Sequence, residues 1–167
     1  MAEHGEMSGA SVRVAATRAD AELAGKLLDD FLAEFDTPSP GAAKFGERLA
    51  TAIAADDGLL VLMAHADGAP VGLAVLAMRP TCFVDGRAIM LEELYVVPKR
   101  RGQGIGSALL RRAITEAQTR GVEFFEVGVD EGDVEARRFY ERHGFTNAAA
   151  PGSDERMLYF EQELGPG

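Results

Sequence analysis

The sequence predicts one mixed α/β domain. Its 167 residues are enough for a single domain with one sizeable core. Apolar stretches typical of strands alternate with stretches whose apolar residues recur every three or four positions, as in amphipathic helices. No internal repeat or low-complexity linker separates them. We therefore expect a domain over residues 11–163, a disordered lead at 1–10 and a tail at 164–167.

The elements follow from these patterns and from the turn residues between them. Asp20 is a candidate N-cap of the first helix, and Gly121 and Gly144 are typical of helix ends. Asp67-Gly68 and Asp85-Gly86 predict tight turns between strands. Strands are expected at 11–17, 59–65, 70–78, 88–97 and 122–129, from 145 onward and at 157–163. Helices are expected at 20–35, 42–55, 104–120 and 134–143.

Composition and charge narrow the function classes. The chain is 47% hydrophobic and 26% charged, and no apolar run approaches the ~20 residues of a membrane span. A formal net charge of -10 argues against nucleic acid as a partner, because binding to it normally needs a basic face. A single cysteine, Cys82, and the absence of a signal-peptide pattern predict a cytoplasmic location. No residue spacing typical of a metal site is present.

The most informative stretch is a basic, glycine-rich turn with the sequence Arg-Gly-Gln-Gly-Ile-Gly at 101–106. It lies between a predicted strand and a predicted helix. The first N–H groups of a helix lack intrahelical partners, and the helix dipole is positive there. Glycines let the backbone approach a ligand closely. This order of elements predicts a binding site for a phosphate or pyrophosphate.

Two familiar phosphate-binding loops do not fit this turn. A P-loop ends in Gly-Lys-Ser/Thr, whereas Gly106 is followed directly by Ser107. The dinucleotide fingerprint needs a third glycine three residues after the second, and the chain has Ser107 or Leu109 there. Taken alone, the turn is equally consistent with a glycine-rich helix entry that binds nothing.

A second segment favours a ligand-binding turn over a helix entry that binds nothing. Residues 139–145 read Phe-Tyr-Glu-Arg-His-Gly-Phe, and residues 91–98 read Leu-Glu-Glu-Leu-Tyr-Val-Val-Pro. With the Arg-x-x-Gly-x-Gly turn between them, residues 88–145 resemble the GNAT superfamily of N-acetyltransferases. The resemblance implies a six- or seven-stranded, mostly antiparallel sheet with helices on both faces. It also implies acetyl-CoA as co-substrate and no metal.

The resemblance further implies which residues bind the coenzyme. In the family, the turn binds the pyrophosphate through backbone N–H groups, and the strand before it pairs with the pantetheine arm like an added strand. A family asparagine that binds this arm is replaced here by Asp133, which cannot donate a hydrogen bond when ionised and is also a candidate helix N-cap. The implied coenzyme-binding residues are Leu94, Tyr95, Val96, Arg101, Gly102, Gln103, Gly104, Ile105, Gly106, Ser107 and Asp133.

Acetylation of an amine needs a proton acceptor, a hydrogen-bond donor that stabilises the oxyanion, and a proton for the departing thiolate. Glu92 is the candidate base, because it interrupts an apolar strand where the family often has a carboxylate, and burial would raise its pKa. Strand alternation places it on the face of Leu94 and places Glu93 on the other face. The alternative for Glu92 is a solvated strand residue. By resemblance, Tyr140 is the general acid and the Leu94 N–H the oxyanion donor.

The sequence indicates only the broad chemical class of the molecule that accepts the acetyl group. Carboxylates near the end of the first helix and in the loop at 146–156 favour a small cationic amine, although solvated surfaces would have the same composition. Because exposed final strands often pair in this family, a homodimer is a candidate assembly. Three other functions stay open: a protein N-acetyltransferase, a non-catalytic acyl-CoA-binding module, and a phosphate-binding domain unrelated to acyl transfer.

Overall fold

The computed structural model describes residues 9–56 and 58–165. It divides the chain into two compact units, with the boundary between Val127 and Gly128. The prediction of one domain over 11–163 stays a prediction. Most of the expected lead, residues 1–8, and the last two residues of the expected tail lie outside the described residues.

The first unit is built on a five-stranded sheet with the order β1-β2-β3-β4-β5. Neighbouring strands are antiparallel except β4 and β5, which are parallel. The strands are β1 (Ser11–Val14), β2 (Leu59–Ala66), β3 (Ala69–Pro80), β4 (Arg87–Val96) and β5 (Val122–Val127). The helices are α1 (Arg18–Glu34), α2 (Ala42–Ala55), the 3-10 helix η1 (Pro98–Arg100) and α3 (Ile105–Thr119).

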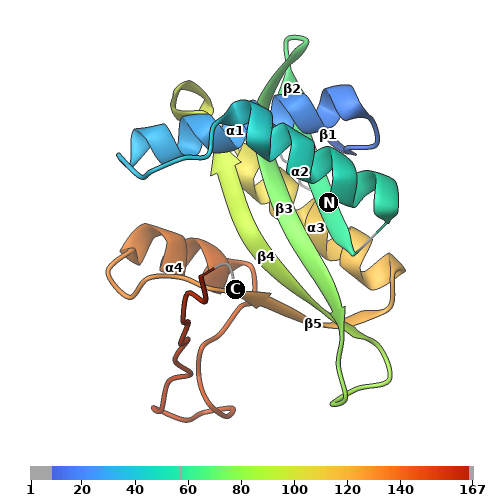
Figure 1. Ribbon diagram of the computed structural model, residues 1–167. Coiled ribbons are helices and arrows are strands. Elements are labelled where there is room, and N and C mark those ends of the chain that lie inside the picture. The colour runs from blue at the N-terminus through green and yellow to red at the C-terminus, as the bar shows by residue number, and fades with distance from the viewer. Residues whose placement is uncertain (1–8, 57, 166–167) are drawn as a thin grey trace, which may run out of the picture. The chain divides into compact units, whose positions relative to one another are not determined.

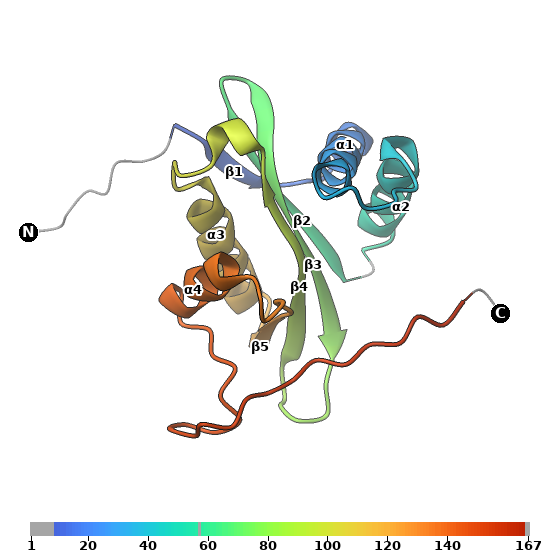
Figure 2. The same ribbon diagram turned by 90° about the vertical axis from the view of Figure 1, so that its left-hand side faces the viewer.

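Helices cover both faces of this sheet, as expected. Figures 1 and 2 show α1 and α2 on one face and α3 on the other. The first face buries Leu27 and Leu49 against Leu73, Val75 and Tyr95 of the central strands. The mixed α/β class and the mostly antiparallel sheet are thus confirmed.

Two glycines allow α1 and α2 to pack closely. A Cβ atom added to Gly25 would lie 2.5 Å from the backbone nitrogen of Gly46, so a larger side chain would push the helices apart. This contact fixes the helix pair above the central strands, where the apolar faces of both helices are buried.

A β-bulge in β4 changes which side chains face α1 and α2. Val75 pairs with Glu93 while the next residue, Leu76, pairs with Leu91, so Glu92 is an extra residue in the ladder. Beyond the bulge, Tyr95 belongs to the core under α1. Since a bulge shifts the alternation of side chains, odd-numbered residues lie on opposite faces before and after it.

The second unit contains α4 (Val134–Arg142) and one isolated bridge between Ala148 and Arg156. The predictions of strands from 145 onward and at 157–163 are therefore wrong, and the described sheet has five strands instead of six or seven. The run of apolar and aromatic residues that begins at Met157 is typical of a strand, but a strand also needs a hydrogen-bonded neighbour. Here Leu158 and Phe160 are 74% and 85% exposed.

Among the described residues, no helix is long and apolar enough to cross a membrane.

Candidate functional site

The glycine-rich turn leads directly into α3 and leaves the start of this helix without a side-chain cap. Gly102 and Gly104 have φ of +73° and +78°, a region in which other residues are strained. Gly104 is the N-cap, and within residues 9–56 and 58–165 no side-chain cap of α3 is present. The N–H groups of Ile105, Gly106 and Ser107 also lack intrahelical acceptors, which makes this helix end suited to an anion.

The side chain of Arg101 binds within the chain. Its guanidinium donates two hydrogen bonds to the carboxylate of Glu34, at 2.6 and 2.7 Å, and Nε donates to the carbonyl oxygen of Val96 at 2.9 Å. It also lies 5.7 Å from the centre of the Tyr95 ring. Arg100 forms an ion pair with Asp67. The expected positive charge of the turn is therefore partly neutralised, which leaves its backbone N–H groups as the main candidates for binding an anion.

This ion pair also shifts the pKa of its members. The hydrogen bonds from Arg101 hold the pKa of Glu34 below its ordinary value and raise that of Arg101. Burial raises the pKa of Tyr95, and the nearby Glu34 carboxylate adds to this rise. The end of α1, β4 and the turn are thereby connected by charged hydrogen bonds.

One hydrogen bond and the strand register together identify which backbone groups of β4 face away from β3. Val97 donates its N–H to Val71 at 3.0 Å, and the β3–β4 pairs continue in antiparallel register from there. Only every second residue of an antiparallel strand bonds to its partner. The N–H and C=O groups of Leu94 and Val96 therefore point to the other side of β4.

On that other side, the neighbouring strand stops early. β5 ends at Val127, which pairs with Leu91. Within the described residues of the first unit, β4 has no partner strand there beyond Leu91. Of these groups, the Val96 carbonyl accepts from Arg101 and the Leu94 N–H donates to Glu93, which leaves the Leu94 carbonyl and the Val96 N–H for an extended ligand next to the glycine-rich turn. The backbone groups of Tyr95 face β3, so the pairing of Leu94, Tyr95 and Val96 with a ligand stays a prediction.

The two adjacent glutamates of β4 have different surroundings. Glu92, expected to be buried, is exposed as the extra residue of the bulge, and Glu93 is partly buried. Burial raises the pKa of Glu93, while a hydrogen bond from the Leu94 N–H at 3.0 Å opposes this rise. Period-two alternation missed this difference because it assumes an unbroken ladder. The apolar residues around the Glu-Glu pair were the only sequence signal pointing to Glu93.

The other two predicted site residues belong to the second unit. Tyr140 is partly buried on α4, and its ring lies 5.2 Å from that of Phe139 and 5.6 Å from that of Phe145. Asp133 is the N-cap of α4 and accepts a hydrogen bond from Ala136 N–H at 2.9 Å. The N-cap alternative for Asp133 is thus observed. Coenzyme binding by Asp133 and acid catalysis by Tyr140 stay predictions.

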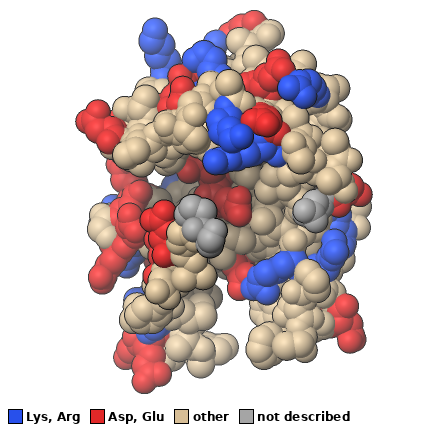
Figure 3. Space-filling model, in the orientation of Figure 1, with Lys and Arg blue, Asp and Glu red and all other residues tan. Residues whose placement is uncertain are grey.

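The acidic residues near the end of α1 are largely paired. Asp30 accepts hydrogen bonds from Lys26, Asp29 accepts one from Ser39, and Glu34 binds Arg101. Figure 3 shows acidic and basic side chains next to one another in the upper part of the view, whereas acidic side chains predominate along its left edge. The expectation of an acidic opening for a cationic amine is therefore weakened around α1. Among the described residues, no group of three or more His, Cys, Asp or Glu is placed to hold a metal ion.

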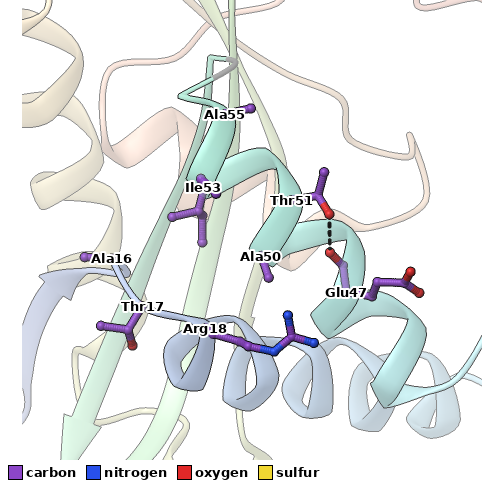
Figure 4. Close-up of a pocket in the computed structure, with 9 residues that line it drawn as sticks. Ala16, Thr17, Arg18, Glu47, Ala50, Thr51, Ile53 and Ala55 are labelled. Atoms are coloured by element: carbon purple, nitrogen blue, oxygen red, sulfur yellow. Dashed lines mark hydrogen bonds between the residues drawn. The ribbon is translucent and has the colours of Figure 1, made fainter.

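A pocket of about 620 Å³ lies at the other end of α1. Figure 4 shows Thr17, Arg18 and Glu47 at its rim, with Thr51 donating a hydrogen bond to the backbone oxygen of Glu47. At ~1.5 Å per residue, the length of α1 separates this pocket from Glu34 by roughly 25 Å. None of the predicted site residues lines the pocket.

Comparison with known proteins identifies the family. Residues 24–145 match the model of the acetyltransferase (GNAT) family, so the chain belongs to this family and is an N-acetyltransferase. An aminoglycoside N(6')-acetyltransferase type 1 of Stenotrophomonas maltophilia is 33% identical over 126 residues, which cover 72% of this chain and 76% of that protein. An uncharacterized N-acetyltransferase of Mycobacterium bovis is 30% identical over 116 residues, covering 70% and 68% of the two chains.

Solved structures agree with the fold. A crystal structure from Arthrobacter sp. FB24, assigned to the acetyltransferases, is 41% identical and superposes with a TM-score of 0.83 over 98% of this chain and 99% of that one. An aminoglycoside acetyltransferase from a soil metagenome, crystallised with sisomicin, gives a TM-score of 0.72 at 18% identity over 93% and 97% of the chains. At that identity, the second likeness concerns the fold alone.

Proposed function

We propose that this protein is an acetyl-CoA-dependent N-acetyltransferase that acts on a primary amine of a small cationic molecule. The observation that carries the coenzyme assignment is the uncapped start of α3 beside the open edge of β4. One part offers N–H groups to a pyrophosphate, and the other offers strand-like pairing to the amide-containing arm of the same ligand.

The residues present fit this co-substrate. Residues 101–107 would bind the pyrophosphate, mainly through backbone N–H groups. The stretch Leu94, Tyr95 and Val96 would pair with the pantetheine arm through the backbone groups of Leu94 and Val96. Asp133 is the remaining candidate, in the second unit. When bound, acetyl-CoA supplies an activated acetyl group as a thioester.

Starting from an ammonium group, two protons leave the nitrogen and one reaches sulfur, so that one proton is released to solvent. The amine nitrogen forms a bond to the carbonyl carbon, the carbon–sulfur bond breaks, and free thiol and amide result. Glu92 is the proposed acceptor of the ammonium proton, directly or through water, and Tyr140 the proposed donor to the thiolate. A phenol with a pKa of about 10 can protonate a thiolate whose conjugate acid has a pKa near 8.5.

The proposal of a cationic acceptor rests on chemistry and on one relative. The similar Stenotrophomonas maltophilia protein is an aminoglycoside acetyltransferase by name, and its substrate class carries several amines. The chain's formal net charge of -10 favours the approach of a cation. A peptide acceptor is the second candidate. A cytoplasmic location and a homodimer are kept as proposals.

The first experiment is calorimetric titration with acetyl-CoA, CoA and NAD. We expect binding of the first two and no signal with NAD. A screen of amines would follow, with aminoglycosides, polyamines and a lysine peptide compared at equal concentration. Failure of both acetyl-CoA and CoA to bind would overturn the proposal, and saturable binding without turnover on any amine would favour a non-catalytic module.

The residue roles are tested separately. Glu92→Gln and Tyr140→Phe should each lower kcat about 10²- to 10⁴-fold while leaving coenzyme affinity nearly unchanged. Turnover at the wild-type rate in both variants would show that these two roles are wrong, without affecting the binding result.

A further inference from the structure

The Leu94 N–H, which points to the open edge of β4, already has an acceptor. The carboxylate of the preceding residue, Glu93, accepts its hydrogen at 3.0 Å. A backbone N–H that β5 does not reach would otherwise need water or a ligand as acceptor. Glu93 thus occupies the N–H group that an acyl carbonyl oxygen would need if it were bound at this edge.

The bulge is what brings Glu93 into this position. Because Glu92 is the extra residue, Glu93 pairs with Val75 and lies on the face of Tyr95, under α1. Its partial burial makes the ionised form costly, and the Leu94 N–H offsets part of that cost. The carboxylate therefore gains more from this single hydrogen bond than an exposed carboxylate such as Glu92 would gain.

Other ionisable groups around this face already have partners or are neutral. The packed residues of β3 are apolar, and Tyr95 is a neutral phenol at ordinary pH. On α1 and α2, Asp30 pairs with Lys26, Glu34 with Arg101 and Lys44 with Glu47, and Asp29 accepts a hydrogen bond from Ser39. On β5, Glu126 pairs with Arg79 and Glu123 accepts the N–H of Gly86.

We propose that Glu93 and the carbonyl oxygen of the acyl group compete for the Leu94 N–H, so that the Glu93 carboxylate is released only when the thioester is in place. The proposal rests on the proposed acyl-CoA function. It has two consequences. The N–H is satisfied both with and without ligand, and a partly buried negative charge becomes available to bind the ammonium group of the acceptor after the coenzyme has bound.

The test compares acetyl-CoA with CoA, because both have the same phosphates and only the first has a carbonyl oxygen at this position. Calorimetry at several pH values below about 7 gives the ratio of the two dissociation constants. In this ratio the titration of the phosphates cancels, and the CoA thiol, whose pKa is about 8.5, stays protonated. As pH rises and Glu93 ionises, its hydrogen bond with the Leu94 N–H strengthens. The acetyl-CoA constant should then rise roughly three- to tenfold relative to that of CoA.

Two matched variants show whether Glu93 causes the pH dependence of this ratio. In Glu93→Gln the ratio should no longer depend on pH, because the competing group is neutral at all values. In the adjacent Glu92→Gln it should change with pH as in the wild type. A flat ratio in the wild type, or loss of the dependence in Glu92→Gln alone, would overturn the inference while leaving coenzyme binding intact. Loss of binding to both ligands would instead overturn the proposed function, and this inference with it.

A measurement on the wild-type protein tests the hydrogen bond without depending on whether a variant folds. In the free wild-type protein, the ¹⁵N and ¹H shifts of the Leu94 amide should titrate together with the Glu93 side-chain carboxyl carbon. Addition of acetyl-CoA, but not of CoA, should uncouple the two signals. An amide shift that ignores the titration of Glu93 would show that the hydrogen bond does not form in solution.

Discussion

The N-termini of α1 and α3 are built from opposite choices of residue. In α1, the Thr17 hydroxyl caps the N–H of Asp20, and the Asp20 carboxylate accepts the N–H groups of Thr17 and Ala16 and an ion pair from Arg13. In α3, the corresponding N-cap is Gly104, and the third helical position is Ser107.

The difference separates a structural helix end from one suited to a ligand. The chain supplies α1 with its own anion, at the place where the helix dipole favours negative charge. At α3 the first turn contains no acidic residue, and two glycines with positive φ precede the helix. Stability is therefore expected to depend on the start of α1, and coenzyme affinity on the start of α3.

The largest expected effect is the loss of the α1 anion. Asp20→Ala removes a carboxylate that is 5% exposed and leaves Arg13 without its partner, so we expect the free energy of unfolding to fall by about 3 kcal/mol. Chemical denaturation would measure this. The matched change at an exposed pair, Asp30→Asn, should cost less than about 0.5 kcal/mol. Equal losses would contradict the comparison.

The same substitution predicts a pH dependence. The Arg13 side chain and three further hydrogen bonds hold the pKa of Asp20 well below its ordinary value. A lowered folded-state pKa gives stability that is present above the unfolded pKa of about 4 and is lost as pH falls below it. The stability difference between wild type and Asp20→Ala should therefore shrink below pH 4 and stay constant between pH 5 and 7.

The second-largest effect is expected when α3 receives an aspartate at its third helical position, where α1 has Asp20. Ser107→Asp places a carboxylate at the third position, where it favours the helix by about 0.3–1 kcal/mol but repels a phosphate. We expect stability to be kept or slightly raised while acetyl-CoA affinity falls about 10- to 100-fold. Ser107→Asn, similar in size but neutral, is the control for calorimetry. Unchanged affinity in the Asp variant would show that the phosphate binds elsewhere.

A smaller effect is expected from strain in the turn. Gly104→Ala puts a Cβ atom at φ +78°, which costs about 1–2 kcal/mol and shifts the first N–H groups of α3. Coenzyme affinity should fall about five- to tenfold. Gly68→Ala, at φ +76° in the β2–β3 turn, should lose similar stability with no change in affinity. If both variants bind alike, the turn conformation does not control binding.

The smallest effect belongs to the hydroxyl cap of α1. Thr17→Ala removes one acceptor from the helix start and should lower stability by about 1 kcal/mol, with acetyl-CoA affinity unchanged. Thr51→Ala, within α2, removes a hydroxyl that bonds to the preceding turn and should be neutral or slightly stabilising. Thermal unfolding and calorimetry on the same samples would separate the two effects.

Local patterns determined much of the site. The glycines at 102 and 104, the strand before them and the helix after them were predictable, because positive φ, apolar alternation and helix periodicity depend on neighbours in the sequence. The family resemblance was carried by these residues together with Phe-Tyr-Glu-Arg-His-Gly-Phe at 139–145. The start of α1 was predicted one turn too late, since Asp20 is typical of an N-cap and acts here as the third residue of a capping box with Thr17.

Only the tertiary structure decided the rest. The bulge that exposes Glu92 and buries part of Glu93 depends on the register with β3, which no pattern within β4 specifies. The partner of Arg101 is Glu34, 67 residues earlier, and packing of α1 against the sheet brings the two together. The expected strand at 157–163 failed for the same reason. A sequence sets what each segment can form locally, whereas pairing and burial depend on which distant segments meet it.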